Sequence, residues 1–460
     1  MTNGAFSRVL ATFLLCALGA CTESAPAAAP PSAQTAKKPA QDPGTPPPAP
    51  GAPSPGSAAP PQAAGIQAAG TPPPAPGTPS EEPGVWYRAE LIFDGVGDLP
   101  FFLHLPPVGQ PGKAYAVNGE EKAPLEAVWH DNDVKVTGPW AYTLVIAAHR
   151  NAETGTLEGT WTRDTPLWGA VVRKFVARPI KEPDPRIRFP GNSDPKPLNV
   201  AGTWKFQFAE HKDGKGAFEQ GPDGVIHGYV RPGMLGDLRF LSGNVRGKKL
   251  SLSQFNGNSA NLVFAKVSPD GKTMSGLISM QNVWNEKFTA KKVDDYQFVN
   301  KVRMKKGKQT LTLQGLNKYK GKPTLALIFA TWCPSCNDAH PFFTRLYAKY
   351  HPQGLEVLGV AFDLSEDEKS NLAEIDKFRA KHKIPWELLQ EPCTPDTWAK
   401  TMPPEVEGWD GFPVVALIRP DGTVQTVFGG WFGPATGTEG EKLRTWFEGE
   451  LQKLVESAKQ

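Results

Sequence analysis

The chain has 460 residues, with 50 lysines and arginines against 47 aspartates and glutamates. This near balance argues against a protein built mainly to bind nucleic acid or an acidic membrane surface. The length predicts two or three domains. The 47 prolines and 46 glycines exceed what a packed fold uses, so the composition also predicts an unfolded segment. Five cysteines are too few for a disulfide-dense scaffold.

Residues 1–20 have the pattern of a lipoprotein signal peptide. An apolar run at 9–18 follows a short segment with one arginine, which is the order of a secretory signal. Residues 18–21 read Leu-Gly-Ala-Cys and resemble a bacterial lipobox, in which the cysteine is lipidated. We therefore expect Cys21 to anchor the chain at the periplasmic face of the cell envelope. Thr22 follows, where an aspartate would favour the inner membrane, so the outer membrane is favoured. The alternative is simple cleavage that leaves Cys21 as a free thiol.

Residues 21–84 are predicted to be the anchor and a linker. Residues 22–84 carry 19 of the 47 prolines and no aromatic residue. A segment of this composition buries too little apolar surface to offset its ordering entropy, which predicts disorder. Proline-rich chain extends by about 3.1 Å per residue. We therefore expect a stalk that holds the folded domains away from the anchor.

Residues 85–295 are predicted to form a duplicated antiparallel β region. Short alternating runs are separated by turn pairs such as Asn-Gly and Asp-Gly, which are typical of hairpins. Gly84-Val-Trp86 matches Gly202-Thr-Trp204, and this repeat predicts two halves, residues 85–180 and 199–295. Each half has room for seven or eight strands. The halves could form two barrels, one joint barrel or a sandwich.

Residues 303–460 have the strand and helix order of an α/β domain. The apolar run 323–330 has the length of a strand buried on both faces. It leads into Trp-Cys-Pro-Ser-Cys at 332–336, after which a helix is predicted from residue 337. A strand, a second helix, a short strand, a hairpin through 419–422 and a last helix complete the order. A Cys-x-x-Cys pair at the first strand-to-helix junction is typical of a thioredoxin fold.

This domain resembles the TlpA/ResA-like thiol-disulfide oxidoreductases, the exported branch of the thioredoxin superfamily. The resemblance is carried by the Trp-Cys-Pro-Ser-Cys motif, by Pro341, and by Gly-Phe-Pro at 411–413. It implies protein thiol or disulfide substrates, and no cofactor beyond a redox-active disulfide between Cys333 and Cys336. It also implies a cis peptide bond before Pro413 and a set of residues that bind substrate: Trp332, Pro334, Phe412 and Pro413.

The expected place of Cys333 at a helix N-terminus predicts its reactivity. Unpaired backbone N–H groups and the helix dipole favour an anion there, and the thiolate is the nucleophile in disulfide exchange. Cys336, one helical turn later, would resolve the mixed disulfide that forms. We therefore predict a thiol-disulfide oxidoreductase, and the resemblance favours a reductant.

Two positions depart from the family pattern. Thioredoxins carry a buried acid in the strand before the motif, where this chain has Leu327. TlpA/ResA-like members often carry a glutamate at the position of Ala339. We hypothesise that water, Asp338 or His340 accepts the proton of the resolving thiol instead.

Other interpretations stay open at this point. The chain could be a non-enzymatic binding lipoprotein that uses its β region and carries a degenerate thioredoxin domain. It could also be a thiol peroxidase, which would not need Cys336, or hold a permanently closed disulfide. No metal site is predicted, because a second cysteine pair is missing and the histidines lack ligand spacing. Cys393 is either a buried thiol or a third redox partner.

Overall fold

A computed structural model describes the folded part of the chain. The described residues are 83–139, 144–165, 169–191, 194, 196–210, 212–233, 237–296, 300–363, 367–394, 397–409 and 411–459. The predicted signal peptide, the predicted anchor Cys21 and the predicted linker as far as residue 82 lie outside them. Residues 81–460 form one compact unit. Within the described part of the chain, every helix is too short or too polar to cross a bilayer.

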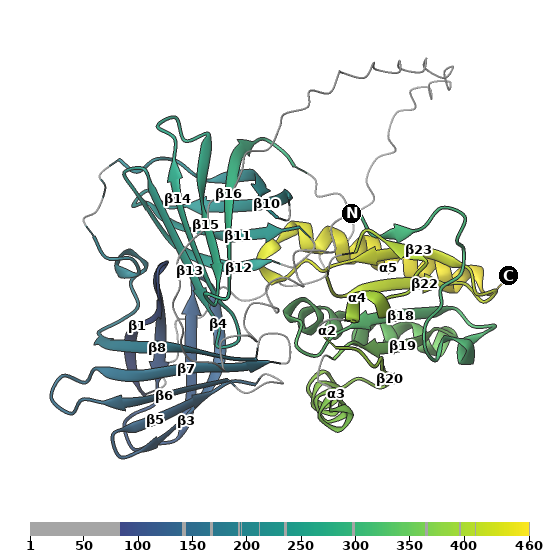
Figure 1. The fold of residues 1–460 in the computed structure, drawn as a ribbon, viewed down its shortest axis with the longest axis horizontal. Helices are drawn as coiled ribbons and strands as arrows, with labels where there is room; N and C mark the ends of the chain where they lie inside the picture. The colour runs from purple at the N-terminus through teal and green to yellow at the C-terminus, as the bar shows by residue number, and fades with distance from the viewer. Residues whose placement is uncertain are drawn as a thin grey trace, which may run out of the picture. The chain divides into compact units, whose positions relative to one another are not determined.

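The first eight strands close into an antiparallel barrel (Figure 1). They are β1 (Val85–Phe93), β2 (Gly97–Leu105), β3 (Gly112–Asn118), β4 (Glu121–His130), β5 (Asp133–Thr137), β6 (Leu144–Arg150), β7 (Leu157–Thr165) and β8 (Gly169–Ile180). Each strand pairs with the next, and β1 also pairs with β8, so no edge strand remains. Buried residues alternate along β1 and β4, as expected when one face of each strand lines the barrel core.

A second barrel repeats this arrangement. Its strands are β9 (Gly202–Phe208), β10 (Lys212–Gln220), β11 (Val225–Pro232), β12 (Leu238–Arg246), β13 (Lys249–Phe255), β14 (Ala260–Val267), β15 (Thr273–Met280) and β16 (Trp284–Val293). The barrel closes where β16 pairs with β9. The predicted fold class of a duplicated antiparallel β region is confirmed, and each half closes on itself rather than forming a joint barrel or a sandwich.

The hairpin between β13 and β14 inserts into the core of the first barrel. Phe255 at its base packs with that core, and its ring centre lies 4.1 Å from the ring centre of Phe101. The indole Nε1 of Trp161 donates a hydrogen bond to the carbonyl oxygen of Gly257 at 3.0 Å. The Asn-Gly sequence at 256–257 is therefore part of an inserted hairpin, and the two barrels share apolar contacts there.

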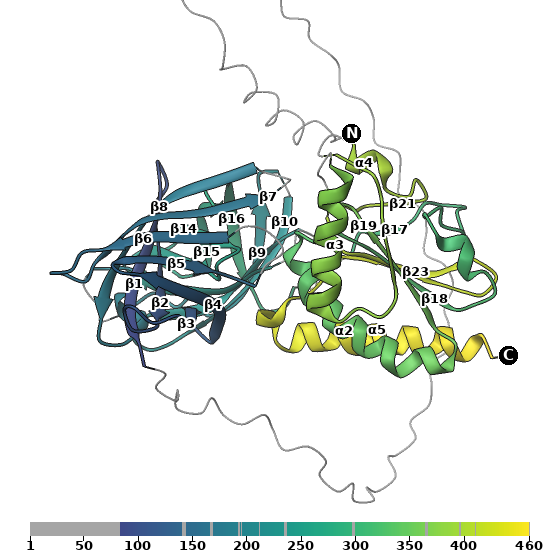
Figure 2. The ribbon, with the colours of Figure 1, turned by 90° about the horizontal axis from the view of Figure 1, so that it is seen from below.

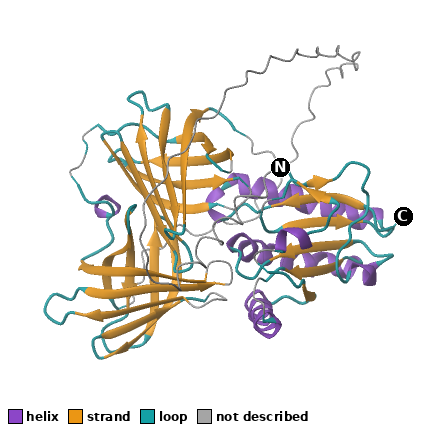
Figure 3. Cartoon of the chain, in the orientation of Figure 1, coloured by secondary structure: helices purple, strands orange, loops and turns teal. Residues whose placement is uncertain are grey.

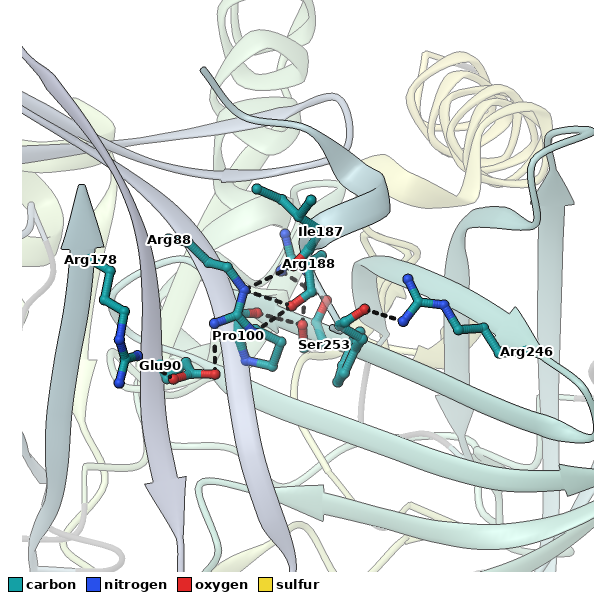
Figure 4. Close-up of polar contacts among 9 residues, drawn as sticks. Arg88, Glu90, Pro100, Arg178, Ile187, Arg188, Arg246 and Ser253 are labelled. Atoms are coloured by element: carbon teal, nitrogen blue, oxygen red, sulfur yellow. Dashed lines mark hydrogen bonds and ion pairs between the residues drawn. The ribbon is translucent and has the colours of Figure 1, made fainter. Parts of the chain in front are cut away.

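The connector between the barrels carries a buried arginine at its centre. A short 3-10 helix, η1 (Pro185–Ile187), ends just before Arg188. The Arg188 guanidinium donates to Ser253 Oγ at 2.8 Å and to Asn118 Oδ1 at 2.7 Å, so it joins β13 of the second barrel to β3 of the first. Its own carbonyl oxygen accepts two hydrogen bonds from Arg88 (Figure 4). This side chain is 1% exposed, so its donors depend on these protein acceptors.

We expect Arg188→Lys to lower the free energy of unfolding of the barrels by about 2 kcal/mol. An ammonium keeps the charge, but it lacks the forked geometry with which the guanidinium reaches acceptors on both barrels. Urea unfolding of the full chain, read from hydrogen exchange in β3 and β13, measures the change. The matched control is Arg178→Lys, because Arg178 makes an exposed ion pair with Glu90 at 3.1 Å, worth little. Equal losses in the two variants would contradict this account of the junction.

The C-terminal part of the chain is built on a five-stranded sheet with the order β20-β19-β18-β22-β23. The central strand β18 (Thr324–Phe329) is buried along its whole length, as its apolar sequence predicts. It runs parallel to β19 (Glu356–Ala361), which runs parallel to β20 (Glu387–Gln390). On the other side, β22 (Val414–Ile418) and then β23 (Val424–Gly429) are antiparallel. A separate pair joins β17 (Arg303–Met304) to β21 (Val406–Glu407).

The α-helices of the described chain all belong to this part, and the purple turn beside the barrels in Figure 3 is the 3-10 helix η1. They are α2 (Pro334–Tyr350), α3 (Glu368–His382), α4 (Trp398–Thr401) and α5 (Thr438–Ser457), with the 3-10 turns η2 (Leu316–Tyr319), η3 (His351–Gln353) and η4 (Pro434–Thr436). α2 and α5 lie side by side (Figure 2), and the rings of Phe343 and Phe447 are 5.4 Å apart. The predicted thioredoxin fold is confirmed.

Candidate active site

Cys333 forms the N-cap of α2, which begins three residues earlier than the sequence predicts. Pro334 occupies the first turn, where the missing N–H of proline costs nothing. The Cys333 sulfur accepts a hydrogen bond from the backbone N–H of Cys336 at 3.3 Å. This sulfur therefore satisfies one of the N–H groups that a helix leaves unpaired at its start. The same donor would stabilise negative charge on the sulfur.

Phe412 and Pro413 lie beside this sulfur, although they are far along the chain. Strand β18 pairs with β22 so that Ile328 is opposite Val414, and the residues after β18 therefore meet the residues before β22. The Cys333 thiol donates to the carbonyl oxygen of Phe412 at 3.5 Å. The peptide bond between Phe412 and Pro413 is cis. The structure thus brings together Cys333, the cysteine predicted to be reactive, and the Gly-Phe-Pro segment at 411–413.

Trp332 lies against Phe412, with their rings edge to face and 5.9 Å between the ring centres. Trp332 is only half-buried, whereas Phe412 and Pro413 are buried. Pro334 keeps part of its surface exposed. Trp332 and Pro334 are therefore the residues of the predicted substrate-binding set that have surface to offer a substrate.

The two cysteines of the motif differ in exposure. Cys333 is 6% exposed and Cys336 is fully buried, so an incoming disulfide can touch only Cys333. Burial raises the pKa of Cys336 well above its ordinary value, and the adjacent Cys333 and the charge of Asp363 raise it further. Cys336 is therefore a protonated thiol at neutral pH, and its attack on a mixed disulfide requires a proton acceptor.

Asn337 holds the turn that contains the motif, a role that the sequence analysis missed. Its Nδ2 donates to the carbonyl oxygens of Thr331 and Cys333, both at 3.0 Å. Its Oδ1 accepts a hydrogen bond from Lys381 Nζ at 3.0 Å and lies 3.0 Å from His382 Nε2, at the end of α3. The amide thereby ties the start of α2 to the preceding loop and to a second helix. An asparagine next to the second cysteine carried no signal in the sequence, because its partners are set by the fold.

Asp363 is a buried acid that the sequence analysis also missed. It follows β19, and the parallel pairing of Phe329 with Ala361 brings Asp363 opposite Thr331. Its Oδ1 accepts hydrogen bonds from the N–H of Thr331 at 3.0 Å and from its hydroxyl at 2.8 Å. Burial raises the pKa of Asp363 to about 7. Among the residues that the structure describes, none forms a hydrogen bond with its other oxygen, Oδ2.

The two acceptors proposed from the sequence have other partners. Asp338 forms an ion pair with Arg239 of β12, with 2.6 Å between its Oδ1 and the guanidinium. His340 Nδ1 donates to the carbonyl oxygen of Cys336 at 2.7 Å. Burial lowers the pKa of His340 to about 4, so its ring is neutral at neutral pH. Each group already has a structural role, and the hypothesis that either takes the proton stays untested.

Cys393 is a buried residue next to the backbone of Asp363. Its thiol donates to the Asp363 carbonyl oxygen at 3.7 Å, and burial raises the pKa of Cys393 to about 12. At neutral pH it is an un-ionised thiol, which is a poor nucleophile. This environment agrees with the buried-thiol interpretation. Across the described residues, no group of three or more His, Cys, Asp and Glu side chains is placed to hold a metal ion.

Comparison with known proteins finds similarity in the C-terminal part of the chain. Residues 297–427 match the AhpC/TSA family. The thiol-disulfide oxidoreductase ResA of Bacillus cereus is 29% identical over 167 residues, which are 34% of this chain and 83% of ResA. The chloroplastic peroxiredoxin Q of Sedum lineare is 28% identical over 120 residues, 26% of this chain and 61% of that protein. A secreted disulfide oxidoreductase of Mycobacterium tuberculosis has a solved structure with 17% identity and a TM-score of 0.23, covering 30% of this chain and 86% of that one.

The predicted resemblance to TlpA/ResA-like proteins is confirmed for the C-terminal domain. Relatives named as thiol-disulfide oxidoreductases belong to the predicted class of enzyme. The chain spans less than two thirds of the first relatives it matches, 61% of the peroxiredoxin Q and 27% of the ResA of Oceanobacillus iheyensis. The family match covers residues 297–427, so it says nothing of the two barrels.

Proposed function

We propose that the chain exchanges thiols and disulfides with exported proteins through Cys333 and Cys336. The observation that carries the proposal is the position of the Cys333 sulfur. It lies between the N–H of Cys336 and the carbonyl of Phe412. Only this cysteine of the pair reaches the surface. The barrels would position the domain or recognise the substrate.

The reaction divides the work between the two sulfurs. The Cys333 thiolate attacks one sulfur of a substrate disulfide, forms a mixed disulfide and releases the other substrate sulfur as a thiolate. Cys336 then gives up its proton and attacks the Cys333 sulfur. The second substrate thiolate leaves, and a Cys333–Cys336 disulfide remains. Two electrons have passed from the cysteine pair to the substrate, and the reverse sequence would oxidise a dithiol.

We propose further that the chain is a reductant held at the envelope by a lipid on Cys21. The direction follows the resemblance to ResA-like proteins, and the anchor follows the lipobox at 18–21. Equilibration of the full chain against glutathione redox buffers tests the direction. We expect a reduction potential nearer to the about −270 mV of thioredoxin than to the about −120 mV of a strong oxidant. Failure of the two cysteines to form a disulfide at any glutathione ratio would refute the exchange itself.

A thiol peroxidase is a second candidate, because the matched family is AhpC/TSA and one relative is a peroxiredoxin. A peroxidase would oxidise Cys333 to a sulfenic acid with hydrogen peroxide and would not need Cys336. Peroxide consumption with dithiothreitol separates the two functions when wild type is compared with Cys336→Ser. Rapid consumption by both proteins would favour the peroxidase. We expect slow consumption by both and disulfide exchange by wild type.

A further inference from the structure

Cys336 needs a proton acceptor, and the positions that carry one in related proteins are Leu327 and Ala339 here. Cys336 and Asp363 lie next to two consecutive residues that follow β18, Ala330 and Thr331. The backbone of Ala330 interacts with the Cys336 thiol. The next residue, Thr331, donates hydrogen bonds to Asp363 from its backbone N–H and from its hydroxyl. The carboxylate is close enough for its charge to act on the thiol. Both groups are buried, and Asp363 is bonded to the residue that comes just before the Trp-Cys-Pro-Ser-Cys motif.

The second carboxyl oxygen of Asp363, Oδ2, is the feature that favours a role as proton acceptor. The side chain is 1% exposed, and its Oδ2 has no hydrogen-bond donor in the part of the chain that the structure describes. A buried carboxylate oxygen without a hydrogen-bond partner costs free energy, and a catalytic role is one of the reasons for which proteins retain such a group. Thr331 fixes the orientation of the carboxyl group through Oδ1 alone. Oδ2 therefore has a lone pair free to accept a proton.

We propose that Asp363 accepts the proton of Cys336 when Cys336 resolves the mixed disulfide. This inference rests on the proposed exchange function. In this step the S–H bond of Cys336 breaks and an O–H bond forms on Asp363. The sulfur then forms its bond to Cys333 while the bond from Cys333 to the substrate breaks. The substrate leaves as a thiolate, and the proton later passes from the carboxylic acid to water.

The charged and titratable groups around Asp363 explain why it can exchange a proton near neutral pH. The titratable groups whose charges interact with that of Asp363 are Cys336 on α2, Cys393 in the loop after β20, and Glu374 on α3. Burial is the main cause that raises the pKa of Asp363, and the negative charge of Glu374 adds to it. Glu374 is itself paired with Lys377 at 2.6 Å through Oε1. A base whose pKa lies near the working pH is the most effective.

The test follows the resolving step directly. In the full chain with Cys16, Cys21 and Cys393 replaced by serine, only the two motif cysteines carry thiols. Mixing with 5,5′-dithiobis(2-nitrobenzoate) releases one nitrothiobenzoate when Cys333 attacks and a second when Cys336 resolves. The rate of the second release, measured by stopped flow from pH 5 to pH 10, reports on the proton acceptor.

We expect the second rate of the protein with Asp363 intact to rise with pH and level off above about 7. With Asp363→Asn, which keeps an oxygen for Thr331, it should be about 100-fold slower at pH 7.5 and should rise with pH without levelling. If Asp363 acted only as a charge, its removal would ease ionisation of Cys336 and make the release faster. A faster or unchanged rate would therefore overturn the proposal.

Glu374→Gln provides a second test that leaves Asp363 in place. Removing the neighbouring negative charge should lower the pH at which the second rate levels off. The matched control is Asp376→Asn, an exposed acid on the same helix, which should leave the profile unchanged. Identical profiles for wild type and Glu374→Gln would contradict the proposed surroundings of Asp363. Absence of any second release while Asp363 is intact would instead refute the exchange function, and the inference with it.

Discussion

Replacing Cys333 with serine is expected to reduce the turnover of a disulfide substrate more than about a thousandfold. A hydroxyl in this position is not ionised at neutral pH, and the thiolate is the species that attacks a disulfide. Cys336 cannot substitute for it, because Cys336 is fully buried and protonated. Reduction of insulin in the presence of dithiothreitol, with the full chain as catalyst, measures the effect.

Two further variants show whether the loss is specific to the motif. Cys393→Ser should retain wild-type turnover, because the Cys393 thiol is buried and donates its hydrogen bond to the backbone oxygen of Asp363, not to its carboxyl group. Cys336→Ser should retain the first attack and accumulate a covalent complex with the substrate, since nothing resolves the mixed disulfide. Substantial turnover by Cys333→Ser would show that the Cys-Pro-Ser-Cys motif is not the reactive centre.

The sequence predicts those residues of the site that lie close to one another along the chain. The apolar strand and the two cysteines three residues apart are both read from residues 323–336. Asp363 could not be found in the same way, because it meets Thr331 only through the parallel pairing of β18 with β19. An aspartate after a strand also occurs in ordinary turns. Register and burial, which the sequence does not state, give this residue its chemistry.

The barrels show the same limit on a larger scale. Alternating residues and turn pairs predict the strands and their repeat, because both signals are local. Closure depends on whether β1 meets β8 and β16 meets β9, contacts between strands far apart in the chain. The insertion of Phe255 into the neighbouring barrel is equally non-local, since it depends on partners such as Phe101. A hairpin that fills its own barrel would have the same sequence pattern.

Asp363→Asn is expected to stabilise the C-terminal domain at alkaline pH relative to acidic pH. An acid whose pKa is raised by folding favours the folded state when protonated, so wild type loses stability as pH rises from about 4 through 7. A rise from 3.8 to about 7 corresponds to about 4 kcal/mol. The asparagine does not titrate, so the free energy of unfolding of the Asp363→Asn variant does not decrease in this way as pH rises. Between pH 4 and pH 8, the stability of Asp363→Asn relative to wild type should therefore increase by about 4 kcal/mol.

The measurement is urea unfolding of the full chain at several pH values, followed by hydrogen exchange of the amides in β18 and β19. Replacing the carboxyl group by an amide also changes the free energy of unfolding by an amount that does not depend on pH. The change of the stability difference with pH therefore reports only the titration of Asp363. Asp376→Asn, on the surface, should show no trend. A constant difference between Asp363→Asn and wild type would mean that Asp363 is ionised throughout. In that case the carboxylate would be too weak a base at neutral pH to take the proton of Cys336. The expected trend would instead show that the folded domain loses stability at neutral pH in order to keep a base near Cys336.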